Sequence, residues 1–321
     1  MKKILVINFR YFGDALISAS LSVRIRELWP DAHITYLVFD SVAGVLEGIE
    51  TIDEILTVPE RPGKWEQFRW MVAHWNNYDL AFVTQTGTRP GLYGFFMARE
   101  RIGFTPGFSK RNWWKKMLLT KHVQEVPGPK ILQLDSLLTA TGAEPAKAPY
   151  VPQPHAQLPA EACFDVPYVV LHLMPRYAYK AWPSNNWSAL VRRLNDAGLK
   201  VVLTGGNNAS ELAAIRDIVP EGADAVILAG KLSFGQTAEL IARSKGFVGP
   251  DTGTTHVASS TGVPIVTLFG LAIMRAFIRT DYFLNLNIKL AYAFKCVLNS
   301  AFFISQFFII TNISKRTAAA F

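Results

Sequence analysis

A short loop near residue 250 combines an acid, a glycine, a row of hydroxyls and a histidine. It reads Asp251-Thr-Gly-Thr-Thr-His256 and lies between two short apolar runs. A helix that begins inside the loop leaves its first amides unpaired at the positive end of its dipole, and Gly253 lets the backbone approach a ligand closely. The loop can therefore hold a phosphate. An ordinary helix start capped by Asp251 or Thr252 fits equally well, and His256 alone is more typical of a packed or surface histidine.

A second candidate stretch, Asn-Phe-Arg-Tyr-Phe-Gly-Asp-Ala-Leu-Ile-Ser at residues 8–18, follows the first apolar run. Gly13 permits a tight turn, and Asp14 stands at the start of the helix that follows. A carboxylate there can act as a general base, although an N-cap aspartate is the favoured interpretation of this stretch alone. The three-glycine dinucleotide pattern is absent, so the spacing argues against a nicotinamide cofactor.

Two further loops follow strands in the second half of the chain. Arg176 and Lys180 lie in one of them, where cations can neutralise a phosphate leaving group. A solvated loop whose Trp182 and Trp187 anchor the core explains that stretch equally well. The other loop places Glu211 shortly after two glycines at residues 205 and 206. It can receive a nucleoside, or it can be a plain strand-to-helix turn.

Composition narrows the class of protein. Half of the 321 residues are hydrophobic, which is ample for two domains of ordinary size, and the formal charge of +8 suits an anionic partner. Cys163 and Cys296 form neither a disulfide framework nor a metal site. The sequence contains no Asp-x-Asp pair and no Cys/His cluster, which disfavours a metal-dependent sugar transferase and a zinc enzyme. The N-terminal apolar run is too short for a signal peptide, so we expect a cytoplasmic protein.

The elements that position these loops alternate between short β-branched runs and longer amphipathic stretches. The sequence predicts strands at residues 4–7, 34–39, 52–58 and 80–84, with a helix over residues 15–29. A proline-rich linker at about residues 145–165 precedes a second series. That series has strands at residues 168–172, 200–204, 225–228, 247–248 and 265–269, and helices at about residues 184–197, 209–218 and 233–244. This pattern predicts two doubly wound α/β domains.

Together these stretches resemble glycosyltransferase family 9, the ADP-heptose:lipopolysaccharide heptosyltransferases, over residues 1 to about 270. The resemblance rests on segments that occur in the order of the family: Gly13-Asp14, Arg101-Ile-Gly103, Lys180-Ala-Trp-Pro183, Asp251-Thr-Gly-Thr-Thr-His256, Gly262-Val-Pro264 and Phe269-Gly270. It implies a GT-B fold, in which two Rossmann-like doubly wound domains face a central cleft. We therefore expect an N-terminal acceptor-side domain at residues 1–150, a nucleotide-sugar-binding domain at 151–270 and an atypical hydrophobic tail at 271–321.

The resemblance also implies an activity, namely inverting, metal-independent transfer of heptose from ADP-heptose to the inner core of lipopolysaccharide. By similarity, Asp14 is the general base and Lys180 pairs with the departing diphosphate. The donor-binding residues implied are Asp251, Thr252, Gly253, Thr254, His256 and, more loosely, Glu211. No metal and no cofactor are implied, since ADP-heptose is a substrate.

The implied acceptor is an anionic glycolipid at the inner face of the inner membrane. Basic positions in the first domain suit it, and we expect Arg61, Lys64 and Arg101 to bind the acceptor. The segment at residues 110–116 mixes cations with tryptophans, as interfacial surfaces do. A solvated basic face explains each segment equally well. Peripheral contact with the inner membrane and no nucleic-acid partner are the resulting expectations.

The chain changes character after residue 270. Residues 296–314 carry no charge and are rich in phenylalanine, which predicts a buried or interfacial helix more than a membrane span. Two alternatives therefore stay open: a transferase of the same fold that uses another nucleotide sugar, and a catalytically impaired remnant that still binds a nucleotide sugar or a membrane. In the second case we expect a poorly soluble or membrane-associated chain with much lower transferase activity than a chain that carries a family-like tail.

Overall fold

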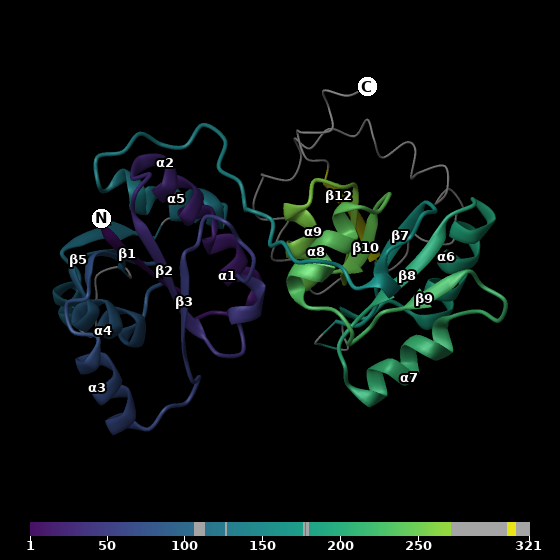
Figure 1. Cartoon of the computed structure of the whole chain (residues 1–321), viewed down its shortest axis with the longest axis horizontal. Helices are drawn as coiled ribbons and strands as arrows, with labels where there is room; N and C mark the ends of the chain where they lie inside the picture. Colours follow the sequence, from purple (N-terminus) through teal and green to yellow (C-terminus); the bar gives the residue numbers. More distant parts are fainter. Residues whose placement is uncertain (106–112, 126, 176, 178–179, 271–306, 313–321) are drawn as a thin grey trace. The chain divides into compact units, whose positions relative to one another are not determined.

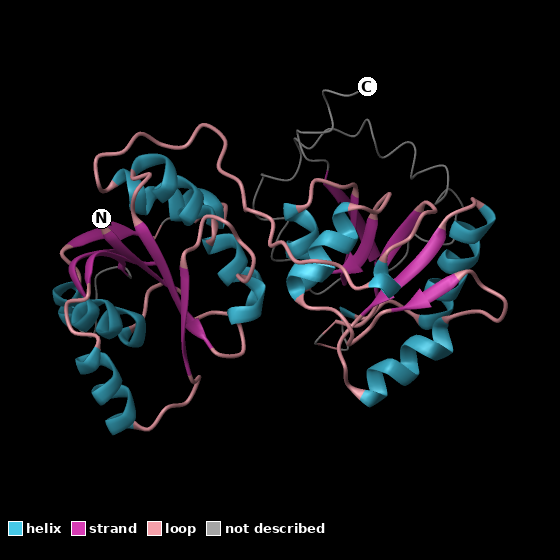
Figure 2. Ribbon diagram, in the orientation of Figure 1, coloured by secondary structure: helices cyan, strands magenta, loops and turns pink. Residues whose placement is uncertain are grey.

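The computed structural model describes residues 1–105, 113–125, 127–175, 177, 180–270 and 307–312 (Figure 1). The chain divides into two compact units, Met1–Pro154 and His155–Phe321. Each contains one sheet with helices on both faces, which is the predicted α/β architecture (Figure 2). The two units are described separately below.

The first unit is built on a six-stranded, all-parallel sheet with the order β3-β2-β1-β4-β5-β6. Its strands are β1 (Lys3–Ile7), β2 (His33–Phe39), β3 (Glu54–Val58), β4 (Tyr78–Val83), β5 (Ala98–Thr105) and β6 (Lys121–Gln124). The central strands are nearly continuous apolar runs because both of their faces are covered. The predicted strands at residues 4–7, 34–39, 52–58 and 80–84 are confirmed, with shifts of one or two residues at most ends.

Helices cover both faces of this sheet (Figure 1). One face carries α1 (Phe12–Ser18), α2 (Ser20–Leu28) and α5 (Lys130–Thr139); the other carries α3 (Lys64–Ala73) and α4 (Thr88–Met97), whose buried side chains join Leu5 and Ile7 in one core cluster. Two short 3₁₀ helices, η1 (Ala43–Val45) and η2 (Trp113–Leu118), complete the unit, and η2 lies against α4.

The single helix predicted over residues 15–29 is wrong in one respect, because the structure divides it at Ala19 into α1 and α2. Three serines accompany the break, and each donates its hydroxyl to the carbonyl three residues earlier: Ser18 to Ala15, Ser20 to Ile17 and Ser22 to Ala19. Serine hydroxyls that bond back to the helix bend it. The tight turn expected at Gly13 is likewise absent, since Gly13 lies inside the first turn of α1.

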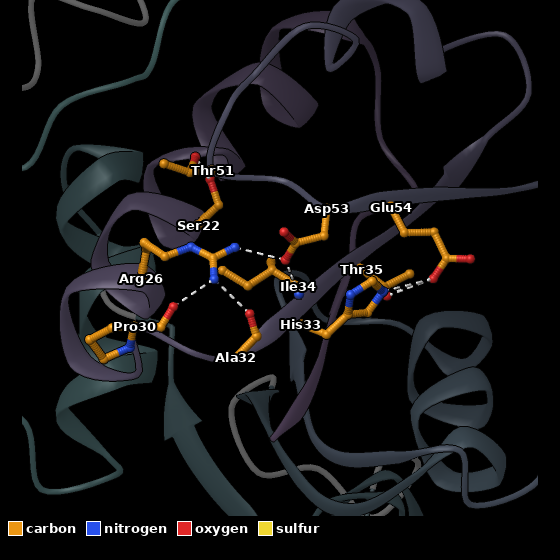
Figure 3. Close-up of polar contacts among 10 residues, drawn as sticks. All are labelled: Ser22, Arg26, Pro30, Ala32, His33, Ile34, Thr35, Thr51, Asp53 and Glu54. Carbon is orange, nitrogen blue, oxygen red and sulfur yellow. Dashed lines mark hydrogen bonds and ion pairs between the residues drawn. The ribbon is translucent and has the colours of Figure 1, made fainter. Parts of the chain in front are cut away.

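A polar network connects the turn between α2 and β2 to Asp53, the residue before β3 (Figure 3). The Arg26 guanidinium donates to two carbonyls of the turn, at 2.7 and 2.9 Å, and to Asp53 Oδ2 at 2.7 Å. The same carboxylate oxygen accepts the backbone N–H of Ile34 at 2.7 Å. β3 begins at Glu54, directly after this aspartate, rather than at the predicted residue 52.

The second unit repeats the architecture, with the strand order β12-β11-β10-β7-β8-β9. Its strands are β7 (Tyr168–His172), β8 (Lys200–Thr204), β9 (Ala225–Ile227), β10 (Phe247–Pro250), β11 (Ile265–Gly270) and β12 (Phe307–Asn312). The helices α6 (Ser184–Asp196) and α7 (Ala209–Ile218) join one core cluster; α8 (Phe234–Ala242) and α9 (Gly253–Ser260) join the other, on the opposite face, and η3 (Ala160–Ala162) precedes β7. Helix α8 begins with a capping box, in which the Ser233 side chain accepts the Gln236 backbone N–H and the Gln236 side chain accepts the Ser233 backbone N–H.

The tail contributes a strand where the sequence predicted a helix. β12 runs antiparallel to β11, with Asn312 opposite Ile265 and Phe307 opposite Gly270. A helix or membrane span that includes residues 307–312 is therefore wrong; aromatic and β-branched residues of this kind favour strands. The rest of the tail, residues 271–306 and 313–321, lies outside the described residues. No helix of the described part combines the length and the apolarity needed to cross a membrane.

Candidate active site

Both sheets reverse their strand order at one point, and the loops that follow the strands there hold most of the predicted site residues. The reversal lies between β1 and β4 in the first unit and between β7 and β10 in the second. Adjacent loops leave in opposite directions at such a switch point, which opens a crevice at the carboxyl ends of the strands. A ligand site is therefore expected at the carboxyl ends of the strands on either side of each switch point.

In the second unit, the loop after β7 brings Lys180 onto the residue that follows β10. The Lys180 Nζ atom lies 2.8 Å from Asp251 Oδ2 and 3.3 Å from the Asp251 carbonyl oxygen. Both side chains are largely shielded, with 16% of the lysine and 28% of the aspartate exposed. Residues 71 positions apart in the sequence thus form one ion pair at the switch point. Arg176, the other cation expected in this loop, lies outside the described residues.

Helix α9 begins beside this ion pair. Of the two predicted N-cap residues, Asp251 and Thr252, the structure has Thr252 at this position. The Thr252 side chain makes no capping hydrogen bond. Gly253 and Thr254 are the first two helical residues, and the Thr255 hydroxyl donates to the Pro250 carbonyl at 2.5 Å. A helix N-terminus with a fixed ammonium group beside it has the charge and the donors to bind an anion.

A buried histidine that the sequence analysis did not select lies below this loop. His172, the last residue of β7, places Nδ1 3.1 Å from the Thr204 hydroxyl and Nε2 3.4 Å from the Thr254 hydroxyl. Burial lowers the pKa of His172 to about 4, so the ring is neutral near pH 7. One neutral imidazole thus links the ends of β7 and β8 to the start of α9.

Glu211 supports the turn that follows β8. Its Oε1 atom accepts the backbone N–H of Gly206 at 2.8 Å. A Cβ atom added at Gly205 or Gly206 would meet the Glu211 carboxylate at 2.7 or 2.8 Å, so both glycines are needed for this contact. The structure therefore gives Glu211 a local structural contact at the edge where a ribose-binding role is expected; that role stays a prediction.

In the first unit, Asp14 lies in the loop-to-helix segment that follows β1. It is the third residue of α1 and is half-buried, while the N-cap position belongs to Tyr11. The interpretation of Asp14 as an N-cap aspartate is therefore wrong. The carboxylate remains at the carboxyl edge of the sheet, where the base role placed it, and that role stays a prediction.

A buried polar network holds the loop that leads to Asp14. Asn8 Nδ2 donates to the Thr84 hydroxyl at 3.0 Å and more weakly, at 3.4 Å, to the Asp14 carbonyl oxygen. Gln85 exchanges two hydrogen bonds with the backbone of Phe9, at 3.2 and 3.3 Å. The ends of β1 and β4 are thereby tied together, and the start of α1 is fixed relative to both.

The same edge carries two of the predicted acceptor-binding cations. Arg61 and Lys64 are exposed and follow β3, whose carboxyl end lies at the edge that bears Asp14. Their loop is held by Arg89, another residue that the sequence analysis did not select. The Arg89 guanidinium donates to the carbonyls of residues 59 and 60 at 2.6 Å and lies 5.0–5.7 Å from the ring centres of Phe9, Phe39 and Tyr93.

Arg101, the third predicted acceptor residue, is not brought to this edge. It lies within β5, and its guanidinium donates at 2.9 Å to the carbonyls of Ala98, Arg99 and Leu118. Burial lowers the pKa of this guanidinium. These contacts give Arg101 a structural function, and its acceptor role stays a prediction.

The structure thus assembles Lys180, Asp251 and residues 252–254 in one place, with His256 half-buried in the first turns of α9. Glu211 lies at the neighbouring strand. Asp14, Arg61 and Lys64 share an edge of the other unit. Within the described residues, no group of three or more His, Cys, Asp or Glu side chains has the arrangement of a metal site.

Comparison with known proteins identifies the class of this chain. The family model of glycosyltransferase family 9 (heptosyltransferase) matches residues 76–277. The chain therefore belongs to glycosyltransferase family 9, and it is a glycosyltransferase.

Individual relatives agree with this assignment. The chain is 25% identical over 278 residues to lipopolysaccharide heptosyltransferase 3 of Escherichia coli, a match that covers 81% of each chain. It is 23% identical over 297 residues to lipooligosaccharide heptosyltransferase 2 of Haemophilus ducreyi, covering 84% of this chain and 83% of that protein.

Solved structures confirm the fold. The E. coli ADP-heptose LPS heptosyltransferase II aligns with a TM-score of 0.67 at 22% identity, covering 84% of this chain and 85% of that one. The E. coli heptosyltransferase WaaC with ADP-2-deoxy-2-fluoro heptose aligns with a TM-score of 0.70 at 18% identity, covering 83% and 88%. The predicted GT-B fold class is thereby confirmed.

Proposed function

We propose that this glycosyltransferase transfers heptose from ADP-heptose to the inner core of lipopolysaccharide, with inversion at the anomeric carbon and without a metal ion. The observation that carries the proposal is the Lys180 ammonium group held at Asp251, beside the first amides of α9. Family membership and the names of the relatives point to heptose and to lipopolysaccharide.

The chemistry of the proposed step follows from where charge develops. An acceptor hydroxyl attacks the anomeric carbon of the heptose, and the bond to the diphosphate oxygen breaks with its electron pair on ADP. Lys180 and the backbone of residues 252–254 stabilise that charge, as a fixed cation and fixed dipoles can without reorganising. Asp14 takes the proton of the acceptor hydroxyl. Asp251 contacts the sugar, and Glu211 contacts the ribose.

The acceptor side rests on the first unit. Arg61 and Lys64 are exposed cations on the edge that bears Asp14, and anionic groups of the lipopolysaccharide core suit them. We place the enzyme in the cytoplasm, in peripheral contact with the inner membrane, where such an acceptor is available.

A donor and acceptor panel tests the proposal. The full chain is incubated with ADP-heptose, and separately with other nucleotide sugars, in the presence of truncated core acceptors and a metal chelator. We expect a heptosylated core and released ADP when ADP-heptose is the donor, and no transfer from the other nucleotide sugars. Turnover with a different nucleotide sugar supports the alternative of another donor on the same fold, and turnover that requires a metal overturns the metal-independent mechanism.

A further inference from the structure

Helix α3 presents apolar side chains on two of its faces. Trp70 and Met71 face inward and belong to the core side of the unit. On the outer side, Trp65, Phe68 and Val72 follow one another at helical spacing, and Trp75 continues the line just after the helix. Trp65 is 78% exposed and Trp75 is 51% exposed. A surface helix normally buries its single apolar stripe, so the outer stripe calls for a partner.

The exposed stripe continues across α4 through ring contacts. Phe96 of α4 meets Phe68 with ring centres 5.9 Å apart and Trp75 at 5.4 Å. The neighbouring Phe95 is exposed, and the Arg101 Cζ atom lies over its ring, 5.3 Å from the ring centre. The contacts of Arg101 described above thus connect this aromatic row to β5 and to the end of η2.

Helix η2 packs against α4 and carries further exposed apolar groups together with cations. We call the resulting surface the aromatic face; its members are Trp65, Phe68, Val72, Trp75, Phe95, Trp113, Trp114 and Met117, all exposed. The charged residues of α3 and η2 on and around it are Lys64, Arg69, Lys115 and Lys116, opposed by the one carboxylate of Glu66. The surface therefore combines large apolar groups with an excess of positive charge.

We propose that the aromatic face docks this protein onto an anionic phospholipid bilayer. Indole rings favour the membrane–water interface, and lysine and arginine near them are attracted to anionic headgroups. A second copy of the chain is a poorer occupant, because a two-fold contact sets the same cations against one another. The inference rests on the proposed function, which places the enzyme in peripheral contact with the inner membrane, and it names the surface that makes this contact.

Vesicle binding by the full-length chain tests the proposal. Co-sedimentation is measured with vesicles of phosphatidylcholine alone and of phosphatidylcholine mixed with phosphatidylglycerol. We expect binding to the mixed vesicles that weakens as salt is raised. The double variant Trp65→Ser/Trp75→Ser should bind about tenfold or more weakly, a change of about 1.4 kcal/mol or more. The matched control is Tyr150→Ser, which removes an aromatic side chain of the same 51% exposure as Trp75 from the linker.

A second pair of variants separates charge from apolar contact. Arg69→Gln should reduce binding to the anionic vesicles, whereas Arg192→Gln, an exposed arginine on α6, should not. Wild-type chain that fails to bind the mixed vesicles overturns the proposal, and so does equal loss in a variant and its control. Concentration-dependent dimerisation that Trp65→Ser abolishes also overturns it. Turnover on a water-soluble acceptor is measured in parallel and should be unchanged in Trp65→Ser/Trp75→Ser, so failure of docking and failure of the transferase activity are distinguishable.

Discussion

Lys180 is proposed to exchange a structural partner, Asp251, for the diphosphate of the donor. Without donor it pairs with Asp251 at 2.8 Å. A bound diphosphate offers it a denser negative charge, which it can approach by a small movement away from that carboxylate. The ion pair thus holds the ammonium group where leaving-group charge is proposed to develop.

Lys180→Ala should therefore lower kcat by about 10²-fold, which is the loss expected when one group that stabilises transition-state charge is removed. Lys180→Arg, which keeps the charge, should retain part of the activity. Steady-state kinetics with ADP-heptose and a truncated core acceptor provides the test. A Lys180→Ala enzyme with wild-type kcat would remove the lysine from the mechanism.

His172 makes a prediction about stability. Its pKa is about 4 in the folded chain because of burial, against about 6.5 for an exposed histidine. Between these pH values the His172 imidazole is protonated in the unfolded chain but not in the folded chain. Folding stability therefore falls as the pH is lowered from about 6.5 to about 4. The loss attributable to this residue is at most about 3 kcal/mol at the end of that window.

The contribution of His172 is measured by urea denaturation of wild type and His172→Asn at pH 7, 5.5 and 4.5. The variant should show a flatter pH dependence of the unfolding free energy. A His172→Asn slope equal to that of wild type contradicts a buried neutral imidazole.

At the scale of elements, close approach explains one segment that the sequence analysis had recognised only by resemblance. A Cβ atom at Gly103 of β5 would lie 2.8 Å from Val83 Cβ and 3.0 Å from Leu119 Cδ2. The glycine thus allows β5 and Leu119, the residue after η2, to pack closely against β4.

Gly103→Ala should accordingly destabilise the chain by about 1–3 kcal/mol through overpacking. Gly63→Ala is the control, because its new Cβ atom would have no neighbour nearer than 3.7 Å. Chemical denaturation of the two variants compares them directly. Equal stability would show that β5 can shift to accommodate the methyl group.

The sequence predicted those elements best whose apolar pattern is local. β7, β8 and α7 begin and end where the periodicity placed them. β5 was not predicted because three of its first four residues are charged, Ala-Arg-Glu-Arg, and its burial is continuous only in the second half. α4 was not predicted because Pro90 and two glycines are typical of a loop sequence. Proline is nevertheless tolerated in the first turn of a helix, where Pro90 lies.

The candidate site divides in the same way. Lys180, Asp251 and Gly253 could be selected because each stands in a short local motif. Asn8 and Gln85 find their partners 76 residues away, and His172 bonds to residues 32 and 82 positions distant. Such pairs are created by strand order, which no local spacing reveals.

At the scale of the whole molecule, residues 307–312 of the tail are part of the second sheet. β12 pairs with all six residues of β11 and so occupies what is otherwise an open sheet edge. An open edge offers unpaired backbone groups to another chain and promotes aggregation. Residues from beyond 270 thus complete the sheet that carries the proposed donor site.

A chain ended after residue 306 should consequently be less soluble than the full chain. A chain ended after residue 312 keeps β12 and serves as the control. Expression of both, followed by measurement of the soluble fraction and size-exclusion chromatography, compares them. Identical behaviour of the two shortened chains would show that β12 does not protect the edge of β11.

The proposed transfer takes Asp14 as its general base, and Asp14 is the residue on which that proposal depends most. The measurement is kcat for heptose transfer from ADP-heptose to a truncated core acceptor, for wild type and for Asp14→Asn. Asparagine keeps the size of the side chain but cannot accept the proton. The account predicts a fall of about 10²-fold or more in kcat with unchanged ADP affinity by calorimetry. Wild-type turnover in Asp14→Asn, or no heptose transfer by the wild-type chain, would contradict it.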